Sequence, residues 1–338
     1  MKEAVAANLV NVFKRSEAPV VFFCNALGDH LLSRPTILAL QMIFEGRLGF
    51  VGAKGADKLF FPDVTFRVIH NIRFHGNFSF DANEFLTFRQ DYDAIINLNW
   101  WDSQDMQDVI KLAPDVPLLP LCKHYGIFDS FGTNTHISDY MFKVPKLFDA
   151  NLSIEKFSRF YSIDEKIRCI FDEFKRKIHP FKRVLGVHTL TRDNKQWPPG
   201  KFRKLLDLFF SQYKDFVALI VDPIDRGLDP DGLSDRIIRF ENGDLSTTSS
   251  FIALCDAFVG IDSYFLHVAD LARIPAVGIF GPTLPIQWGC RFTQHRHVSY
   301  PDISEVPVEE VLHALSELIQ QNVSTNFCAE KQLKLQET

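Results

Sequence analysis

Short apolar runs alternate along the chain with longer amphipathic segments. The apolar runs predict strands over residues 20–24, 49–51, 94–98, 117–121, 183–188, 216–221 and 257–261, and a further strand that ends in Gly-Pro-Thr at 281–283. Apolar residues three and four positions apart predict helices over residues 31–44, 105–112, 163–177, 199–213, 246–255, 264–272 and 306–320. This alternation predicts an α/β fold with two Rossmann-like, doubly wound parallel-sheet domains that face a cleft.

With 338 residues, the chain is longer than a single hydrophobic core usually supports. We place the domain boundary at His179-Pro180, after the charged helical stretch 163–177. The predicted domains cover residues 1–165 and 180–325. The last helix is expected on a domain face, with packing back on the first domain left open.

Composition excludes several classes of protein. The net charge is −5 and acidic residues outnumber basic ones in both halves, which argues against a nucleic-acid binder. The six cysteines show no Cys-x-x-Cys pair and no metal-ligand spacing, so we expect reduced thiols, a cytoplasmic location and no metal site. No apolar run approaches the ~20 residues that cross a bilayer, although a peripheral contact with the membrane stays open.

The junction after the predicted strand 257–261 is the most informative segment. Asp262 follows this strand directly, and Ser263 precedes the next predicted helix. A helix start carries about half a positive unit charge and unpaired N–H donors, which suits a phosphate. A carboxylate there would instead serve a sugar hydroxyl or a cation. The alternative is that Asp262 only caps the helix.

Two further segments follow predicted strands. Residues 25–30, Asn-Ala-Leu-Gly-Asp-His, place Asp29 where a carboxylate could accept a proton, unless it caps the next helix. Residues 186–199 offer the hydroxyls of Thr189 and Thr191 and the ammonium of Lys195, donors that suit a diphosphate. Trp197 is expected to anchor the helix that follows.

Common nucleotide and hydrolase motifs are missing from the sequence. It has no GxxxxGK[ST] loop, no GxGxxG after its first strand and no GxSxG elbow. A P-loop nucleotidase, a nicotinamide enzyme and a Ser-His-Asp hydrolase are therefore disfavoured.

Taken together, the Leu-Gly-Asp of residues 27–29, the Thr-Arg-Asp-Asn-Lys-Gln-Trp-Pro stretch and residues 262–285 resemble the bacterial heptosyltransferases of glycosyltransferase family 9. The resemblance runs from about residue 18 to 320. It implies a GT-B fold, a nucleotide-sugar donor such as ADP-heptose in the carboxyl-terminal domain, and an acceptor such as the lipopolysaccharide core in the amino-terminal one. It also implies inverting, metal-independent transfer without a further cofactor, on the cytoplasmic side of the inner membrane.

The resemblance assigns roles to individual residues. Asp29 matches the general base. The positions that match donor contacts are Thr189, Thr191, Lys195, Leu245, Asp262, Ser263 and His267. Trp100, Trp101 and His124 lie on predicted loops of the first half and could bind an acceptor sugar, or could simply pack.

One departure leaves the donor open. The family usually has glycine where this chain has Tyr264, and the ring is expected where the diphosphate should lie. The alternatives are therefore a transferase with another donor or acceptor, a nucleotide-sugar epimerase, and a non-catalytic protein that binds nucleotide sugars.

Overall fold

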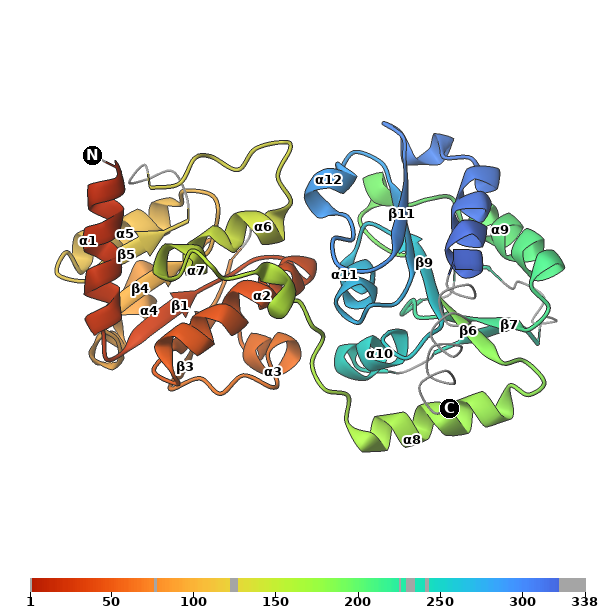
Figure 1. Ribbon diagram of the computed structural model, residues 1–338, viewed down its shortest axis with the longest axis horizontal. Helices are drawn as coiled ribbons and strands as arrows, with labels where there is room; N and C mark the ends of the chain where they lie inside the picture. Colours follow the sequence, from red (N-terminus) through yellow and green to blue (C-terminus); the bar gives the residue numbers. More distant parts are fainter. Residues whose placement is uncertain are drawn as a thin grey trace, which may run out of the picture. The chain divides into compact units, whose positions relative to one another are not determined.

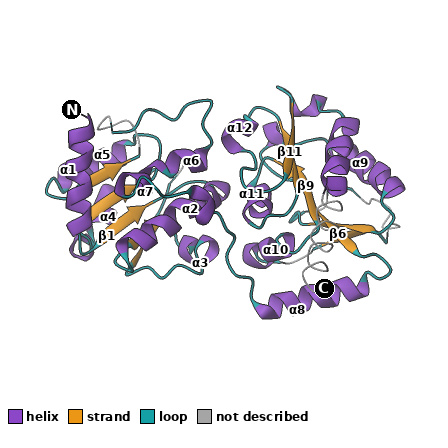
Figure 2. Cartoon of the chain, in the orientation of Figure 1, coloured by secondary structure: helices purple, strands orange, loops and turns teal. Residues whose placement is uncertain are grey.

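The computed structural model describes residues 2–75, 78–121, 127–224, 226–228, 235–240 and 243–321. The chain divides into two compact units, Met1–Tyr161 and Ser162–Thr338 (Figure 1). In both units helices alternate with strands along the chain (Figure 2). Across the described residues, no helix combines the length and the hydropathy that a bilayer crossing requires.

The first unit contains a five-stranded parallel sheet in the order β3-β2-β1-β4-β5. Its strands are β1 (Pro19–Phe22), β2 (Gly49–Gly52), β3 (Ile69–Asn71), β4 (Ala94–Asn97) and β5 (Leu118–Pro120). Its helices are α1 (Lys2–Arg15), α2 (Leu27–Phe44), α3 (Ala56–Phe60), α4 (Ala82–Leu86), α5 (Gln104–Leu112), α6 (Ile137–Met141) and α7 (Lys143–Phe148). The chain leaves β1 toward β2 and β3 and returns on the other side at β4, so the strand order reverses between β1 and β4.

Helix α2 corrects one prediction. Its expected start was residue 31, but it begins at Leu27 with Ala26 as the N-cap. Asp29 therefore lies inside the first turn, its backbone N–H 3.1 Å from the carbonyl of Ala26, and the interpretation of Asp29 as the cap is wrong. Gly28 costs this helix little because it lies in the first turn, where the backbone N–H groups lack intrahelical partners in any case.

Phenylalanine rings fill the core of the first unit. The ring of Phe22 on β1 lies with its centroid 5.1 Å from that of Phe80 and 5.5 Å from that of Phe85, both in edge-to-face geometry. Such pairs add to the free energy gained by burying the apolar area itself. The many phenylalanines of this unit are thus explained by packing.

The second unit contains a six-stranded parallel sheet in the order β11-β10-β9-β6-β7-β8. Its strands are β6 (Arg183–His188), β7 (Phe216–Ile220), β8 (Ile237–Arg239), β9 (Ala257–Ile261), β10 (Ala276–Phe280) and β11 (His295–Ser299). Its helices are α8 (Glu165–Lys177), α9 (Pro199–Gln212), α10 (Leu245–Ile252), α11 (Tyr264–Leu271), α12 (Pro285–Trp288) and a helix over residues 308–321. The strand order reverses between β6 and β9. The α/β fold with two parallel sheets is confirmed.

The two outer strands β8 and β11 were not expected from the sequence. Neither is a continuous apolar run, since β8 spans three residues and β11 reads His-Arg-His-Val-Ser. Edge strands pair on one side only and are often short or polar. Their pairing to β7 and β10 is a tertiary effect.

The first and last described helices of the second unit pack within it. The division between the units falls before α8, whose Phe171 ring lies 5.2 Å from Phe251 of α10. The helix over 308–321 buries its apolar face, including Val311 and Leu315, in the core of the sheet formed by β6 to β11.

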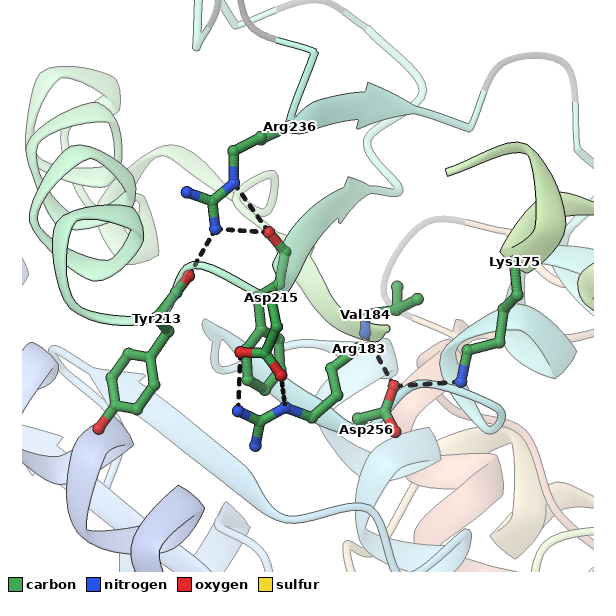
Figure 3. A network of polar contacts seen from close by, with 8 residues as sticks. Lys175, Arg183, Val184, Tyr213, Asp215, Arg236 and Asp256 are labelled. Carbon is green, nitrogen blue, oxygen red and sulfur yellow. Dashed lines mark hydrogen bonds and ion pairs between the residues drawn. The ribbon is translucent and has the colours of Figure 1, made fainter. Parts of the chain in front are cut away.

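A network of ion pairs lies at the amino-terminal edge of the second sheet (Figure 3). The Arg183 guanidinium donates to both carboxylate oxygens of Asp215, at 2.7 and 2.9 Å. The Asp256 carboxylate accepts the Val184 N–H at 2.8 Å and lies 3.5 Å from the Lys175 ammonium. These contacts link the starts of β6, β7 and β9 to one another and to α8.

Candidate functional site

The candidate site lies at the opposite, carboxyl-terminal edge of the second sheet, where the strand order reverses between β6 and β9. Open α/β sheets bind ligands at such switch points, because the loops from the two strands diverge there. The loop after β6 contains Thr191 and Lys195, and Asp262 and Ser263 follow β9 directly. The predicted donor residues from the two segments are thus brought to one place in the fold.

The centre of the site is the carboxylate of Asp262. Its Oδ2 atom accepts hydrogen bonds of 2.6 Å from the Lys195 ammonium and from the Thr283 hydroxyl. Asp262 is 7% exposed as a residue, so this pair is largely shielded from solvent. The interpretation of Asp262 as a helix cap is wrong, because the N-cap of α11 is Ser263 and Asp262 is held by side chains from two loops.

The loop after β6 is fixed so that Lys195 faces Asp262. A short 3-10 turn spans Asp193–Lys195, and the Gln196 amide donates to the Thr191 carbonyl at 2.7 Å. Trp197 is fully buried, and its indole N–H donates to the carbonyl of Val306 at 3.1 Å. The prediction that Trp197 anchors this segment is confirmed.

The start of α11 offers a buried hydroxyl group, that of Ser263. Ser263 is its N-cap in extended conformation, but its side chain makes no capping bond. The Ser263 hydroxyl oxygen is buried and has no hydrogen-bond partner among the residues that the structure describes. A buried hydroxyl without a partner costs free energy, so a ligand oxygen at this position would be stabilised by it and by the helix terminus.

The side chain of Tyr264 is directed toward α10. The residue is 7% exposed, and its hydroxyl lies 3.0 Å from the Ser249 hydroxyl on α10. Its ring also packs edge-to-face with that of Phe265, with centroids 5.2 Å apart. The Tyr264 side chain is therefore directed between α10 and α11.

A second buried carboxylate, Asp222, escaped the sequence analysis. It follows β7, and its Oδ1 atom lies 2.7 Å from Nδ1 of His188 and accepts the Thr189 N–H at 2.9 Å. Its Oδ2 accepts the Thr189 hydroxyl at 2.6 Å. Burial raises the pKa of Asp222, but the hydrogen bonds from His188 and Thr189 outweigh it, so the pKa lies below its ordinary value. The sequence feature that could have identified Asp222 is a single carboxylate directly after a buried strand.

The contacts with Asp222 engage Thr189, one of the residues predicted to bind the donor. This residue is fully buried and its hydroxyl is bound to Asp222, so it holds the end of β6 to the end of β7. Thr191 stays partly exposed. Leu245 is the first residue of α10 and is partly exposed, and His267 is buried in α11, at 4% exposure.

The corresponding edge of the first unit lies at the reversal between β1 and β4. Asp29 is partly exposed in the first turn of α2, where the helix terminus favours a carboxylate. The neighbouring His30 is buried between the rings of Phe23 and Phe60, and burial lowers its pKa to about 4. His30 is therefore neutral near pH 7 and supports the loop by a 3.0 Å contact to the Ala26 carbonyl.

The remaining predicted residues are Trp100, Trp101 and His124. Both tryptophans follow β4 and are partly exposed, with ring centroids 5.1 Å apart. His124 lies outside the described residues. Within the described ranges, His, Cys, Asp and Glu side chains form no group of three or more that could ligate a metal ion.

Comparison with known proteins supports the resemblance. Residues 242–315, which include α11 and the strands on either side of it, match the family model described as glycosyltransferase family 9 (heptosyltransferase). No curated protein sequence matches the chain.

Solved structures resemble the whole fold. A glycosyl transferase family 9 protein from Veillonella parvula has a TM-score of 0.72 at 15% identity, over 90% of this chain and 97% of that chain. The E. coli ADP-heptose lps heptosyltransferase II has a TM-score of 0.65 at 12% identity, over 90% and 99%. The E. coli heptosyltransferase WaaC with ADP has a TM-score of 0.61 at 15% identity, over 89% and 99%. These structures confirm the predicted GT-B fold, and the family model supports the resemblance to glycosyltransferase family 9 over residues 242–315.

Proposed function

We propose that the protein transfers a sugar, heptose from ADP-heptose, onto a glycan of the cell envelope, such as the lipopolysaccharide core, with inversion at the anomeric carbon. In this proposal the second unit binds the nucleotide sugar, and the first unit binds the acceptor and supplies the base. The reaction takes place on the cytoplasmic side of the membrane, where a peripheral contact would bring the enzyme to a lipid-linked acceptor.

The observation that carries the proposal is the cluster of Lys195, Asp262 and Thr283. It combines a cation, a carboxylate and a hydroxyl at the switch point of the sheet, beside the start of α11. A nucleotide sugar needs this combination, because its diphosphate is anionic while its sugar offers hydroxyl groups. A site for a phosphate alone would not need the carboxylate.

The chemistry follows from these groups. The acceptor hydroxyl attacks the anomeric carbon, its proton passes to Asp29, and the bond from that carbon to the diphosphate oxygen breaks. Negative charge then grows on the leaving diphosphate, and Lys195, the Ser263 hydroxyl and the N–H groups of α11 stabilise it. Asp262 accepts hydrogen bonds from the donor sugar. No metal ion is needed for this step.

The choice of donor rests on two supports. Structural neighbours carry the descriptions ADP-heptose heptosyltransferase and heptosyltransferase with ADP. In addition, the Tyr264 hydroxyl lies 3.0 Å from the Ser249 hydroxyl, and this direction of the ring supports a phosphate position that is clear of it. Leu245, at the start of α10, would then contact the adenine.

Nucleotide release tests the proposal. Purified full-length protein is incubated with ADP-heptose, UDP-sugars or GDP-sugars, with and without core glycan fragments as acceptors, and released nucleotide is measured. We expect release of ADP that depends on the acceptor. Consumption of donor without acceptor would instead indicate an epimerase or hydrolase, and no binding of any donor by calorimetry would indicate a non-catalytic protein.

Asp29→Asn tests the assigned base. We expect kcat/KM to fall about 10²- to 10⁴-fold, while the affinity for ADP stays unchanged, because Asp29 belongs to the first unit. Asp57→Asn is the matched control, since Asp57 also lies in the first turn of a helix after a strand of the same sheet. Full turnover by Asp29→Asn would show that the assigned mechanism is wrong.

A further inference from the structure

In the second unit, the loop after β7 holds the start of the loop after β6. Asp222 accepts the Thr189 N–H at 2.9 Å and the Thr189 hydroxyl at 2.6 Å. Further along the loop after β7, the Arg226 guanidinium lies 3.5 Å from the carbonyl oxygen of Thr189. The N–H, the hydroxyl and the carbonyl of Thr189 are thus all contacted from one neighbouring loop.

The same guanidinium also reaches the far end of the loop after β6. Its Nη1 atom donates to Oε1 of Gln196, and the Gln196 amide nitrogen in turn donates to the Thr191 carbonyl at 2.7 Å. The amide of Gln196 is planar, so its oxygen and its nitrogen cannot turn toward other partners independently. We call the contacts of Arg226 with Thr189 and Gln196 the Arg226 link.

Lys195 lies inside the segment that the Arg226 link encloses. It directly precedes Gln196, and its N–H donates to the Arg192 carbonyl at 2.9 Å in the 3-10 turn. Its side chain is 23% exposed and reaches Asp262 at 2.6 Å. A lysine on an unfixed loop would lose conformational entropy when it binds an anion, and fixing the loop beforehand lowers that cost.

The geometry of Arg226 suits a link between two segments. One nitrogen, Nη1, contacts both the carbonyl oxygen of Thr189 and the amide oxygen of Gln196. Such a nitrogen carries two N–H groups, whose directions are fixed in the plane of the guanidinium. Both oxygens are uncharged and belong to the loop that carries Lys195. The guanidinium is therefore used here to hold the loop.

We infer that Arg226 is a positioning residue for donor binding: it holds the loop after β6 in the conformation that presents Lys195 to the diphosphate. The inference rests on the proposed function, in which Lys195 binds this diphosphate, and adds a residue that acts through it. Arg226 itself does not touch the ligand. Its loss should therefore weaken nucleotide binding only as long as Lys195 is present.

A double-mutant cycle on ADP affinity tests the inference with the full chain. Arg226→Met should raise the Kd for ADP about three- to tenfold, and Lys195→Met should raise it further. Adding Arg226→Met to Lys195→Met should change the Kd less than twofold, because the ammonium that the link positions is already gone. Arg226→Lys should recover part of the loss, since an ammonium still donates to Gln196 Oε1. Calorimetric titration with ADP gives the four values.

Arg203→Met is the matched control. Arg203 lies on α9 and donates to the Leu228 carbonyl at 2.8 Å, so it holds the loop after β7 at another point. Its ADP affinity should stay within twofold of wild type. Losses that add in the double variant would show that Arg226 binds ADP directly. An unchanged Kd in Arg226→Met, or an equal loss in Arg203→Met, would show that the link is only structural, and each of these outcomes would overturn the inference.

A second measurement needs no nucleotide. An amine-acylating reagent is added, and the modification of Lys195 is followed by peptide mass spectrometry, with Lys177, 73% exposed, as the internal reference. Held at Asp262 and 23% exposed, Lys195 should react slowly in wild type. Arg226→Met should raise its relative rate about two- to fivefold, because the loop then opens more often. The rate in Arg203→Met should match wild type. An unchanged rate in Arg226→Met would overturn the inference.

This inference and the proposed function can fail separately. If ADP binds to none of the proteins but Lys195 reacts faster in Arg226→Met, the positioning of Lys195 by Arg226 is supported and the nucleotide is the wrong ligand. If ADP release depends on an acceptor while the losses in the cycle add and the reactivity of Lys195 does not change, the transferase stands and the positioning role is wrong.

Discussion

The two edges of the second sheet contain the same kinds of ion pair and use them differently. At the amino-terminal edge, Asp215 and Asp256 are 40% and 33% exposed and bind residues that begin the strands. At the carboxyl-terminal edge, the side chain of Asp262 is 8% exposed and binds Lys195 and Thr283, side chains of two loops. The first arrangement aligns strands. The second places a largely buried charged pair beyond the ends of the strands, where it does not hold one strand to another. Such a pair is typical of a binding site.

The largest expected effect separates the two edges by activity. Asp262→Asn should lower kcat/KM for transfer about 10²- to 10³-fold, because it removes the anion that orients the donor sugar and Lys195. Asp256→Asn should change kcat/KM less than twofold but lower the free energy of unfolding by about 1 kcal/mol, since the Val184 N–H loses a charged acceptor. Nucleotide release and urea unfolding measure the two effects. Equal loss of activity in both variants would contradict the difference in role between the two edges.

Lysine substitutions test the same comparison through nucleotide affinity. Lys195→Met should weaken ADP binding about 10- to 100-fold, the value of a charge-assisted bond to phosphate where water is largely excluded. Lys175→Met, at the amino-terminal edge, should leave ADP affinity unchanged. Calorimetric titration with ADP compares the two. Wild-type affinity in Lys195→Met would contradict the assignment of this ammonium to the diphosphate.

The acid sensitivity of the second unit should depend on Asp222 more than on Asp215. Both groups have a pKa lowered in the folded state, in Asp222 against the effect of burial and in Asp215 chiefly through the Arg183 hydrogen bond. Each therefore stabilises the fold above its unfolded pKa of about 4, and this contribution is lost as pH falls through the lower folded pKa.

Unfolding by urea between pH 3 and 7 measures that difference. Asp222→Asn should cost about 1 to 3 kcal/mol near pH 7 and flatten the acid side of the profile, because it disturbs a buried network. Asp215→Asn should cost less than about 1 kcal/mol, as for other exposed pairs. A larger loss of unfolding free energy in Asp215→Asn than in Asp222→Asn would show that the exposure of a carboxylate does not decide how much it stabilises this unit.

The smallest expected effect concerns Tyr264. Tyr264→Phe removes the 3.0 Å contact with Ser249 and should lower the free energy of unfolding by about 1 kcal/mol. ADP affinity should stay within twofold of wild type, because the ring packs against α10 rather than at the phosphate position. A large gain in ADP affinity on removing the hydroxyl would show that Tyr264 does restrict the nucleotide.

Much of the fold could be predicted because its strands are locally encoded. β6 and β9 have the predicted bounds, and each is a buried apolar run with turn residues after it. Asp29, Lys195 and Asp262 could be named for the same reason, since each lies just after such a run. The outer strands and the start of α2 could not be predicted, because packing and sheet pairing override weak local signals there.

By itself the sequence determined two parallel sheets, a resemblance to family 9 glycosyltransferases and the segments that hold the candidate chemistry, because apolar periodicity and motif spacing are properties of neighbouring residues. Only the tertiary structure decided which side chains meet. Lys195 and Asp262 are 67 positions apart and pair because the strand order sets β6 beside β9. The direction of Tyr264 was likewise decided by the space between two packed helices, which no local pattern encodes.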